Sequence, residues 1–230
     1  MMTISSTHAE MEQIFIKLEL AEAKTICITS DKPRSGSTSL ASALTERYML
    51  AGYKTLLVDF NLFNPSFSDM TLNHTTNSEP LVLREDTQQV FSGIAAPTIL
   101  SDQLAYRDPT NLRHNIKQWT HHFDRIVFDT CALSQTNQSN IPTAVVAHVT
   151  DASVLVVAGG QTTGEELNSA VAQLKATNAN IVGIVLNQFG QNTLSEELVR
   201  VADKGRFLPQ SWKVGIKSWL NKSTLFRQAV

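Results

Sequence analysis

Residues 24–67 read KTICITSDKPRSGSTSLASALTERYMLAGYKTLLVDFNLFNPSF. Residues 25–29 and 56–59 are short, mostly apolar runs of the kind that form buried parallel strands. Between them runs a helical pattern whose apolar face is formed by Leu40, Leu44 and Tyr48. The loop before this helix lies at its N-terminus, where backbone N–H groups and the helix dipole favour anions. We therefore expect an α/β fold with a mostly parallel central sheet and helices on both faces.

The loop and the second strand carry a recognisable pattern. Residues 32–38 read KPRSGST, and LLVD at 56–59 is followed by NPS at 64–66. These residues resemble the P-loop ATPases of the ParA/MinD class, and more closely the cytoplasmic tyrosine kinase domains of bacterial capsule and exopolysaccharide systems. In that family the loop reads K-x-G-x-G-K-[ST]-T. The resemblance implies a three-layer P-loop NTPase fold that binds ATP or ADP with Mg²⁺.

Two later strands extend the resemblance. FDRIVFDT at 123–130 is similar to the family's Walker B strand, and IVGIVLN at 181–187 is similar to a strand whose asparagine contacts the adenine base. A carboxylate at the carboxyl end of a central parallel strand is placed to face a ligand. Two other interpretations stay open: Asp129 caps the following loop, and Asn187 closes a turn.

The resemblance implies a role for each residue that matches a motif. In an active enzyme Asp59 and Asp129 would be catalytic. The magnesium site would be formed by Thr38, Asp59 and Asp129. The nucleotide would be bound by Lys32, Arg34, Gly36, Ser37, Thr38, Ser39 and Asn187.

The departures from the pattern affect the phosphate side of the site. Ser37 stands where the family has the lysine that bridges the β- and γ-phosphates, and Asp31 brings a carboxylate to the start of the loop. Arg34 replaces a glycine and returns one positive charge on a flexible side chain. Loss of one preorganised charge typically costs about 2.7–4 kcal/mol of transition-state stabilisation. The sequence thus predicts weak or absent nucleotide binding and a slow or inactive catalyst.

Length and composition favour a single domain. The chain has 230 residues, of which 42% are hydrophobic, and we expect an N-terminal helix (1–24), a core (25–203) and a tail (204–230). Cys27 and Cys131 lie in apolar surroundings, which predicts buried thiols in a reducing compartment. The N-terminus has no signal-peptide pattern and no window is apolar enough to span a membrane, so we expect a cytoplasmic protein, with the inner face of the membrane as an alternative location.

The remaining core segments give weaker patterns. Residues 9–20 predict a helix packed on the sheet, which we favour over a ring-assembly helix because the arginines of the family's E-x-x-R-x-x-R pattern are absent. Residues 68–106 predict loops with one short strand or helix. Asp108 and Pro109 predict a helix start, with the helix ending near residue 121. Residues 151–157 predict a strand and 164–175 a helix.

The tail concentrates positive charge. Residues 204–230 hold six basic and no acidic side chains, whereas the first 203 residues carry a net charge of −8. Apolar and basic residues alternate there near helical spacing, and the docking residues we expect are Trp212, Lys213, Lys217, Trp219 and Lys222. This stripe packs on its own domain, binds a partner protein or contacts an anionic membrane, and the sequence leaves all three open.

These observations lead to one functional expectation with two alternatives. The first is a degenerate nucleotide-binding-like protein of bacterial exopolysaccharide or capsule biosynthesis or export, weakly active or inactive, that regulates a protein partner. The second is an active ATPase or tyrosine autokinase that uses Lys32 and Arg34 in place of the lost lysine. The third is a ParA/MinD-like positioning protein that docks through its tail. A homodimer stays open, and no nucleic-acid binding is expected.

Overall fold

The computed structural model describes residues 5–70, 80–135 and 140–188. Eight strands form one sheet in the order β3-β4-β5-β2-β6-β1-β7-β8. Their bounds are β1 Thr25–Ser30, β2 Thr55–Phe60, β3 Phe67–Met70, β4 Leu81–Arg84, β5 Gln89–Ile94, β6 Arg125–Thr130, β7 Ala152–Ala158 and β8 Ile181–Asn187. The helices are α1 Ala9–Leu20, α2 Ser37–Leu50, α3 Leu100–Arg107, α4 Pro109–Trp119, α5 Thr143–Val149 and α6 Gly164–Ala176, with a 3₁₀ turn at Leu133–Gln135.

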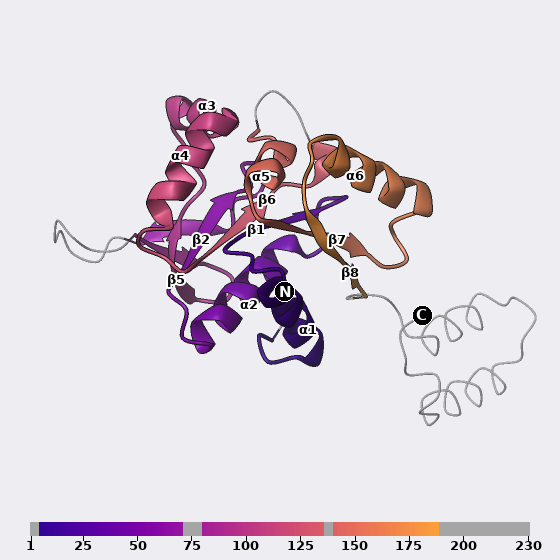
Figure 1. The fold of residues 1–230 in the computed structure, drawn as a ribbon, viewed down its shortest axis with the longest axis horizontal. Helices are drawn as coiled ribbons and strands as arrows, with labels where there is room; N and C mark the ends of the chain where they lie inside the picture. The colour runs from indigo at the N-terminus through magenta and orange to yellow at the C-terminus, as the bar shows by residue number, and fades with distance from the viewer. Residues whose placement is uncertain (1–4, 71–79, 136–139, 189–230) are drawn as a thin grey trace, which may run out of the picture. The chain divides into compact units, whose positions relative to one another are not determined.

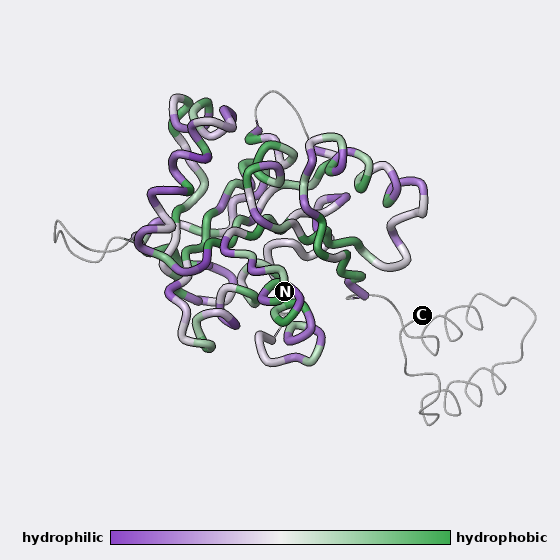
Figure 2. Tube along the Cα trace, viewed as in Figure 1, coloured by the Kyte–Doolittle hydropathy of each residue, from purple (hydrophilic) through white to green (hydrophobic). Residues whose placement is uncertain are grey.

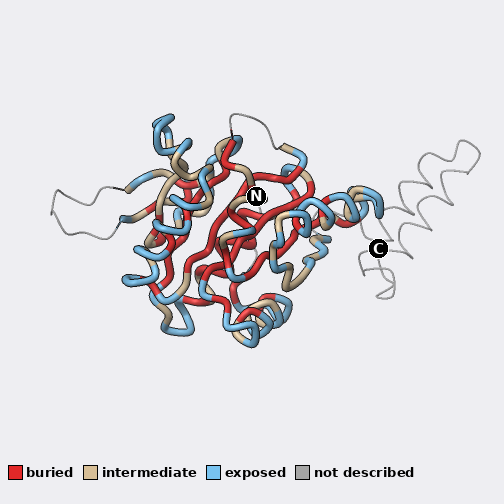
Figure 3. The backbone as a smooth tube through the Cα atoms, turned by 45° about the horizontal axis from the view of Figure 1, so that its top comes forward, coloured by how far each residue is buried: buried red, intermediate tan, exposed pale blue. Residues whose placement is uncertain are grey.

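Helices cover both faces of the sheet, as Figure 1 shows for α1 and α2 on one side and α3 to α6 on the other. The first face buries an apolar cluster formed by α1, α2 and the strands, centred on Leu40, Leu44 and Tyr48. The opposite face buries a second cluster that includes Leu112 of α4, Val146 of α5 and Leu174 of α6. Hydrophobic residues are frequent along the central strands in Figure 2, and the centre of the molecule is buried in Figure 3. The predicted α/β class with a mostly parallel sheet is confirmed.

Several local predictions are also confirmed. The strand–loop–helix–strand unit forms as β1, α2 and β2, and the helix α4 begins at Pro109 with the Asp108 side chain accepting the Thr110 N–H. Both cysteines are buried. The N-terminal helix packs on α2, where Arg47 pairs with Glu12 at 2.7 Å, and it also contacts the sheet, where Arg125 of β6 pairs with Glu19 at 2.8 Å.

The prediction of loops with one short strand or helix for residues 68–106 was wrong. This stretch forms the strands β3, β4 and β5 and the helix α3, although residues 71–79 lie outside the described part of the chain. Strands β3 and β4 have only 4 residues each, and a run so short leaves no readable period. They pair antiparallel, β4 pairs antiparallel with β5, and β5 then joins β2 in parallel. The short helix α5 was missed for the same reason.

The chain separates into two compact units. The first comprises residues 1–157 and 162–186, and the second comprises residues 158–161 and 187–230. Most of the second unit lies outside the described residues, including every predicted docking residue of the tail. The single domain therefore stays a prediction, and so does the docking role. No helix within residues 5–70, 80–135 and 140–188 is long and apolar enough to cross a membrane.

Candidate nucleotide and magnesium site

The loop after β1 and the ends of β2 and β6 meet at the carboxyl edge of the parallel sheet. Strand β1 ends at Ser30 and leads into the loop, while Asp59 and Asp129 stand near the ends of β2 and β6. The two aspartates are directly opposite each other in the β2–β6 register, and Asp129 also faces Ile28 of β1. The topology therefore brings the loop and both carboxylates to the edge where ligands of such sheets bind.

The loop adopts left-handed backbone at two positions. Arg34 has φ 64° and Gly36 has φ 99°, and the helix α2 begins directly after Gly36. The first bond of that helix runs from the Leu40 N–H to the Gly36 carbonyl. The N–H groups of Ser37, Thr38 and Ser39 therefore have no partner within the helix, which is the arrangement that favours an anion at a helix N-terminus.

The two charged residues at the start of the loop are engaged with α6 and the segment before it. Asp31 is buried, and its carboxylate accepts the Thr162 hydroxyl at 2.7 Å and the Ser35 hydroxyl at 3.3 Å. Lys32 pairs with Glu166 at 2.7 Å, which lowers the pKa of Glu166 to about 2. The carboxylate of Asp31 is thus used to hold the loop, and Lys32 is directed toward the N-terminal turn of α6.

The three residues expected to form a magnesium site lie close together. The Thr38 hydroxyl donates to Asp129 Oδ2 at 2.7 Å, and both Asp59 and Asp129 are completely buried. Asp59 also organises the chain after β2, because its two oxygens accept the N–H groups of Asn61 at 2.8 Å and Ser66 at 3.0 Å. The candidate metal residues are therefore adjacent in the structure, as their motifs require.

Burial and mutual repulsion perturb both carboxyl groups. Burial raises the pKa of Asp59 to about 6, although the backbone N–H groups of Asn61 and Ser66 act in the opposite direction. Burial, followed by the negative charge of Asp59, raises the pKa of Asp129 well above its usual range, while the Thr38 hydroxyl lowers it. Two close carboxylates without a cation are each driven toward the neutral form.

These residues fit Mg²⁺. Asp129 Oδ1 is buried and has no hydrogen-bond partner, and Mg²⁺ prefers oxygen ligands. A divalent cation would also offset the repulsion between Asp59 and Asp129. Within the described residues, no group of three or more His, Cys, Asp or Glu side chains is close enough to hold a metal ion. The Thr38 hydroxyl, water and the phosphates of a nucleotide would have to complete the coordination.

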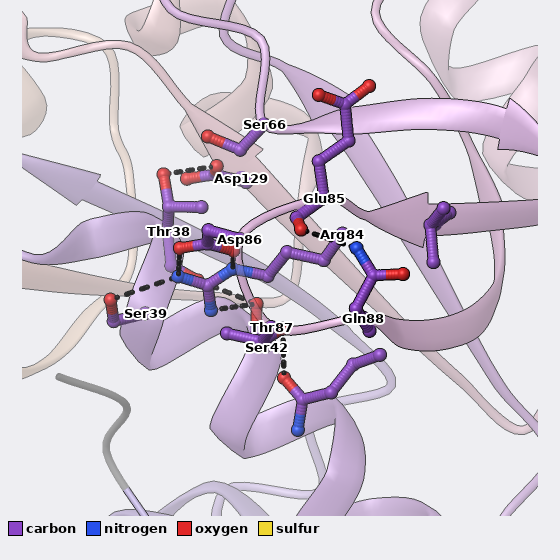
Figure 4. A network of polar contacts seen from close by, with 12 residues as sticks. Thr38, Ser39, Ser42, Ser66, Arg84, Glu85, Asp86, Thr87, Gln88 and Asp129 are labelled. Carbon is purple, nitrogen blue, oxygen red and sulfur yellow. Dashed lines mark hydrogen bonds and ion pairs between the residues drawn. The ribbon is translucent and has the colours of Figure 1, made fainter. Parts of the chain in front are cut away.

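The sequence did not reveal one buried charged residue that lies beside these groups. Arg84, the last residue of β4, is 1% exposed and its guanidinium lies beside the first two turns of α2 (Figure 4). It pairs with Asp86 at 2.8 Å and donates to the hydroxyl groups of Ser42 at 2.9 Å and Ser39 at 3.4 Å. Its location could not be anticipated, because it depends on the strands that the sequence pattern missed.

A cavity of about 420 Å³ adjoins this region. Its lining includes Ser66, whose N–H binds Asp59, and Asp86, which pairs with Arg84. The predicted adenine contact, Asn187, is the last residue of β8, and its carbonyl accepts the Gly159 N–H at 2.8 Å. Asn187 belongs to the second compact unit, so its role toward a base stays a prediction.

Comparison with known proteins identifies capsule tyrosine kinases as relatives. Tyrosine-protein kinase CpsD of Streptococcus pneumoniae is 25% identical over 184 residues, which cover 75% of this chain and 79% of the relative. The putative tyrosine-protein kinase CapB of Staphylococcus aureus is 26% identical over 180 residues, which cover 73% and 76%. The chain matches no protein-family model.

Solved structures show the same fold. The crystal structure of the chimerical protein CapA2B2 matches with a TM-score of 0.61 and 20% identity, covering 80% of this chain and 86% of that one. The septum site-determining protein MinD complexed with Mg-ADP, from Pyrococcus horikoshii OT3, matches with a TM-score of 0.52 and 18% identity, covering 84% and 75%. The architecture is therefore that of the MinD-like P-loop NTPases.

Proposed function

We propose that this chain, a homologue of the bacterial capsule tyrosine kinases, is a weakly active or inactive regulatory partner in capsule or exopolysaccharide biosynthesis or export. The observation that carries the proposal is the placement of Ser37 at the first position of α2, where the resemblance expects the phosphate-binding lysine. A hydroxyl there offers a hydrogen bond but no positive charge to a polyphosphate.

Neither nearby cation replaces that lysine in the arrangement described. Lys32 is paired with Glu166, and Arg34 is exposed on the left-handed turn of the loop. For the alternative of an active ATPase or autokinase, Lys32 would have to leave Glu166 and turn toward the phosphates. The pair is partly exposed, so solvent would compensate for much of its loss and this exchange would cost little free energy. The active enzyme therefore stays an alternative, and a measurement of ATP turnover decides between the two.

The tyrosines favour the regulatory role over autophosphorylation. The chain has three tyrosines, and none lies after residue 106. Tyr48 is completely buried, Tyr53 donates to Glu19 at 2.7 Å, and Tyr106 packs against Phe60. Each of these three side chains has a structural use in the described part of the chain.

The retained half of the site supports residual binding of nucleotide with magnesium. Mg²⁺ would be held by Thr38, Asp59 and Asp129, and it would supply positive charge next to the phosphates of ATP or ADP. The backbone N–H groups of the first turn of α2 would face the same phosphates. We propose weak binding on this basis, in a cytoplasmic protein that acts through a protein partner. Docking through the basic tail, as in a positioning protein, is the second alternative.

The replacement Ser37→Lys tests the proposal, with Ser37→Gln as a control of similar length without charge. A charged hydrogen bond contributes about 1.5–3 kcal/mol, so the lysine variant should bind Mg-ATP about tenfold to a hundredfold more tightly, and the glutamine variant should not. Asp31 is left unchanged because its carboxylate holds the loop through Thr162. A folded lysine variant without any gain would mean that the loop presents no phosphate site, and rapid ATP turnover by the unaltered protein would establish the active alternative.

A further inference from the structure

The buried arginine of β4 is held in an asymmetric ion pair. Its Nε donates to Asp86 Oδ1 at 2.8 Å and its Nη2 donates to Asp86 Oδ2 at 3.0 Å. The Arg84 side chain is 2% exposed, whereas the Asp86 side chain is 35% exposed and lines the 420 Å³ cavity. The positive charge is therefore fixed inside the protein, and the negative charge that neutralises it lies at the solvent boundary.

A purely structural role explains this pair poorly. Removing an arginine from water is costly, and well-packed apolar residues could join β4 to α2 equally well. The neighbouring positions of the hairpin do so: Val82 and Phe91 are buried in the apolar cluster beneath α2. The charge of Arg84 thus requires a different explanation from the packing around it.

The contacts of Arg84 lead directly to the anion-binding turn of α2. Arginine has only hydrogen-bond donors, so the hydroxyl oxygens of Ser39 and Ser42 must accept from it. Ser42 then donates its own proton to the Thr38 carbonyl at 2.9 Å. Because Ser39 Oγ accepts from Arg84 at 3.4 Å, its own proton is available to another acceptor, and the resemblance implies that Ser39 binds the nucleotide.

We propose that Arg84 is a positioning residue of the anion site, which provides from β4 the positive charge that Ser37 does not, and that Asp86 limits how much of this charge a bound anion experiences. The inference rests on the proposed function, because it concerns the same phosphate site. The Arg84 guanidinium lies beneath α2, so it would act on a bound anion through the Ser39 hydroxyl and through its own electric field. The same charge lowers the pKa of Asp129, against the larger effects of burial and Asp59.

The proposal predicts opposite effects for the two partners of one ion pair. Asp86→Asn keeps the size of the side chain and an acceptor oxygen but removes the neutralising charge, so it should tighten the binding of ADP about tenfold. Arg84→Met should weaken binding by a similar factor, and Arg84→Lys should restore part of the loss. Glu85→Gln is the matched control, because Glu85 lines the same cavity and makes the same change in net charge without pairing with Arg84.

The measurement is a titration of the full chain with ADP in the absence of Mg²⁺, followed through the backbone amide signals of Ser37, Thr38 and Ser39. Omitting the metal removes any binding that depends on Mg²⁺ held by Asp59 and Asp129. Amide spectra of each variant verify folding, and the double variant Arg84→Met with Asp86→Asn avoids leaving a lone carboxylate. In that background, Asp86→Asn should no longer tighten binding.

The outcomes separate this inference from the proposed function. Equal affinities in all variants, absence of binding included, would overturn the inference, and so would equal effects of Asp86→Asn and Glu85→Gln. A gain from Asp86→Asn that persists without Arg84 would overturn it as well. Tight binding of Mg-ATP by the unaltered protein would contradict the proposed function, yet the role of Arg84 would still be decided by the differences among the variants.

Discussion

As the pH rises, the metal-free Asp59→Asn variant should gain stability relative to the metal-free unaltered protein. The Asp59 pKa of about 6 lies above its ordinary value of 3.8, so the folded state binds this proton more tightly than the unfolded state. Its favourable contribution is complete below the unfolded pKa and is lost as the pH rises through the folded one. The difference of about 2.2 pKa units corresponds to about 3 kcal/mol.

The magnitude can be isolated because asparagine does not ionise. Asparagine also loses one of the two acceptor oxygens that bind the N–H groups of Asn61 and Ser66, at a cost of about 1–3 kcal/mol that does not depend on pH. The stability of the variant relative to the unaltered protein should therefore increase by about 2.4 kcal/mol between about pH 4 and about pH 7, which is most of the full difference. Relief of the repulsion on Asp129 acts in the same direction.

Urea unfolding in the presence of a metal chelator gives the free energy of unfolding of each protein at each pH. The difference between the two proteins is then compared between the two pH values. Exposed groups such as Glu166 contribute equally to the two proteins, so they cancel. A difference in unfolding free energy that stays constant with pH would refute the reasoning about the buried carboxylate pair. A variant that becomes relatively less stable at high pH would contradict its sign.

Three further changes have expected outcomes. Thr38→Val removes the donor to Asp129 and should cost about 1–3 kcal/mol in chemical denaturation, whereas Thr38→Ser should be nearly neutral. Gly93→Ala would place a Cβ against a side-chain methyl of Val82 and 2.7 Å from the Leu57 carbonyl oxygen. The free energy of unfolding should therefore fall by about 1–3 kcal/mol, which a lower melting temperature would reveal. In the tail, Lys213, Lys217 and Lys222 should be replaced together by Glu. This charge reversal should abolish co-sedimentation of the protein with anionic vesicles and leave its melting temperature nearly unchanged. Vesicle binding that survives the replacement would exclude the tail as the docking element.

The sequence predicted the parts of the site that lie in continuous motifs. The loop, Asp59 and Asp129 each follow a buried parallel strand, and strands of that kind are readable as apolar runs. Their carboxyl ends must meet at one edge of the sheet, so the proximity of Thr38 to Asp129 followed from the topology.

The parts that were missed depend on contacts between distant segments. Asp31 was expected to face the phosphates, but its carboxylate binds Thr162, which is 131 positions away. Arg84 lies on a strand of 4 residues, and a charged residue in so short a strand is ordinarily exposed. Only the antiparallel pairing of β4 with β5 and the packing of the hairpin against α2 bury its side chain. No local pattern could reveal either partner.

Calorimetric titration of the unaltered protein with Mg-ATP tests the central claim most directly. With Ser37 in place of the lysine and Lys32 paired with Glu166, bound phosphates would meet backbone N–H groups and the proposed magnesium site but no lysine held by the loop. We predict a dissociation constant well above the micromolar range, about 100 μM or weaker, which corresponds to a binding free energy of about −5.5 kcal/mol or less favourable. A dissociation constant of about 1 μM or tighter would contradict the account of a degenerate phosphate site.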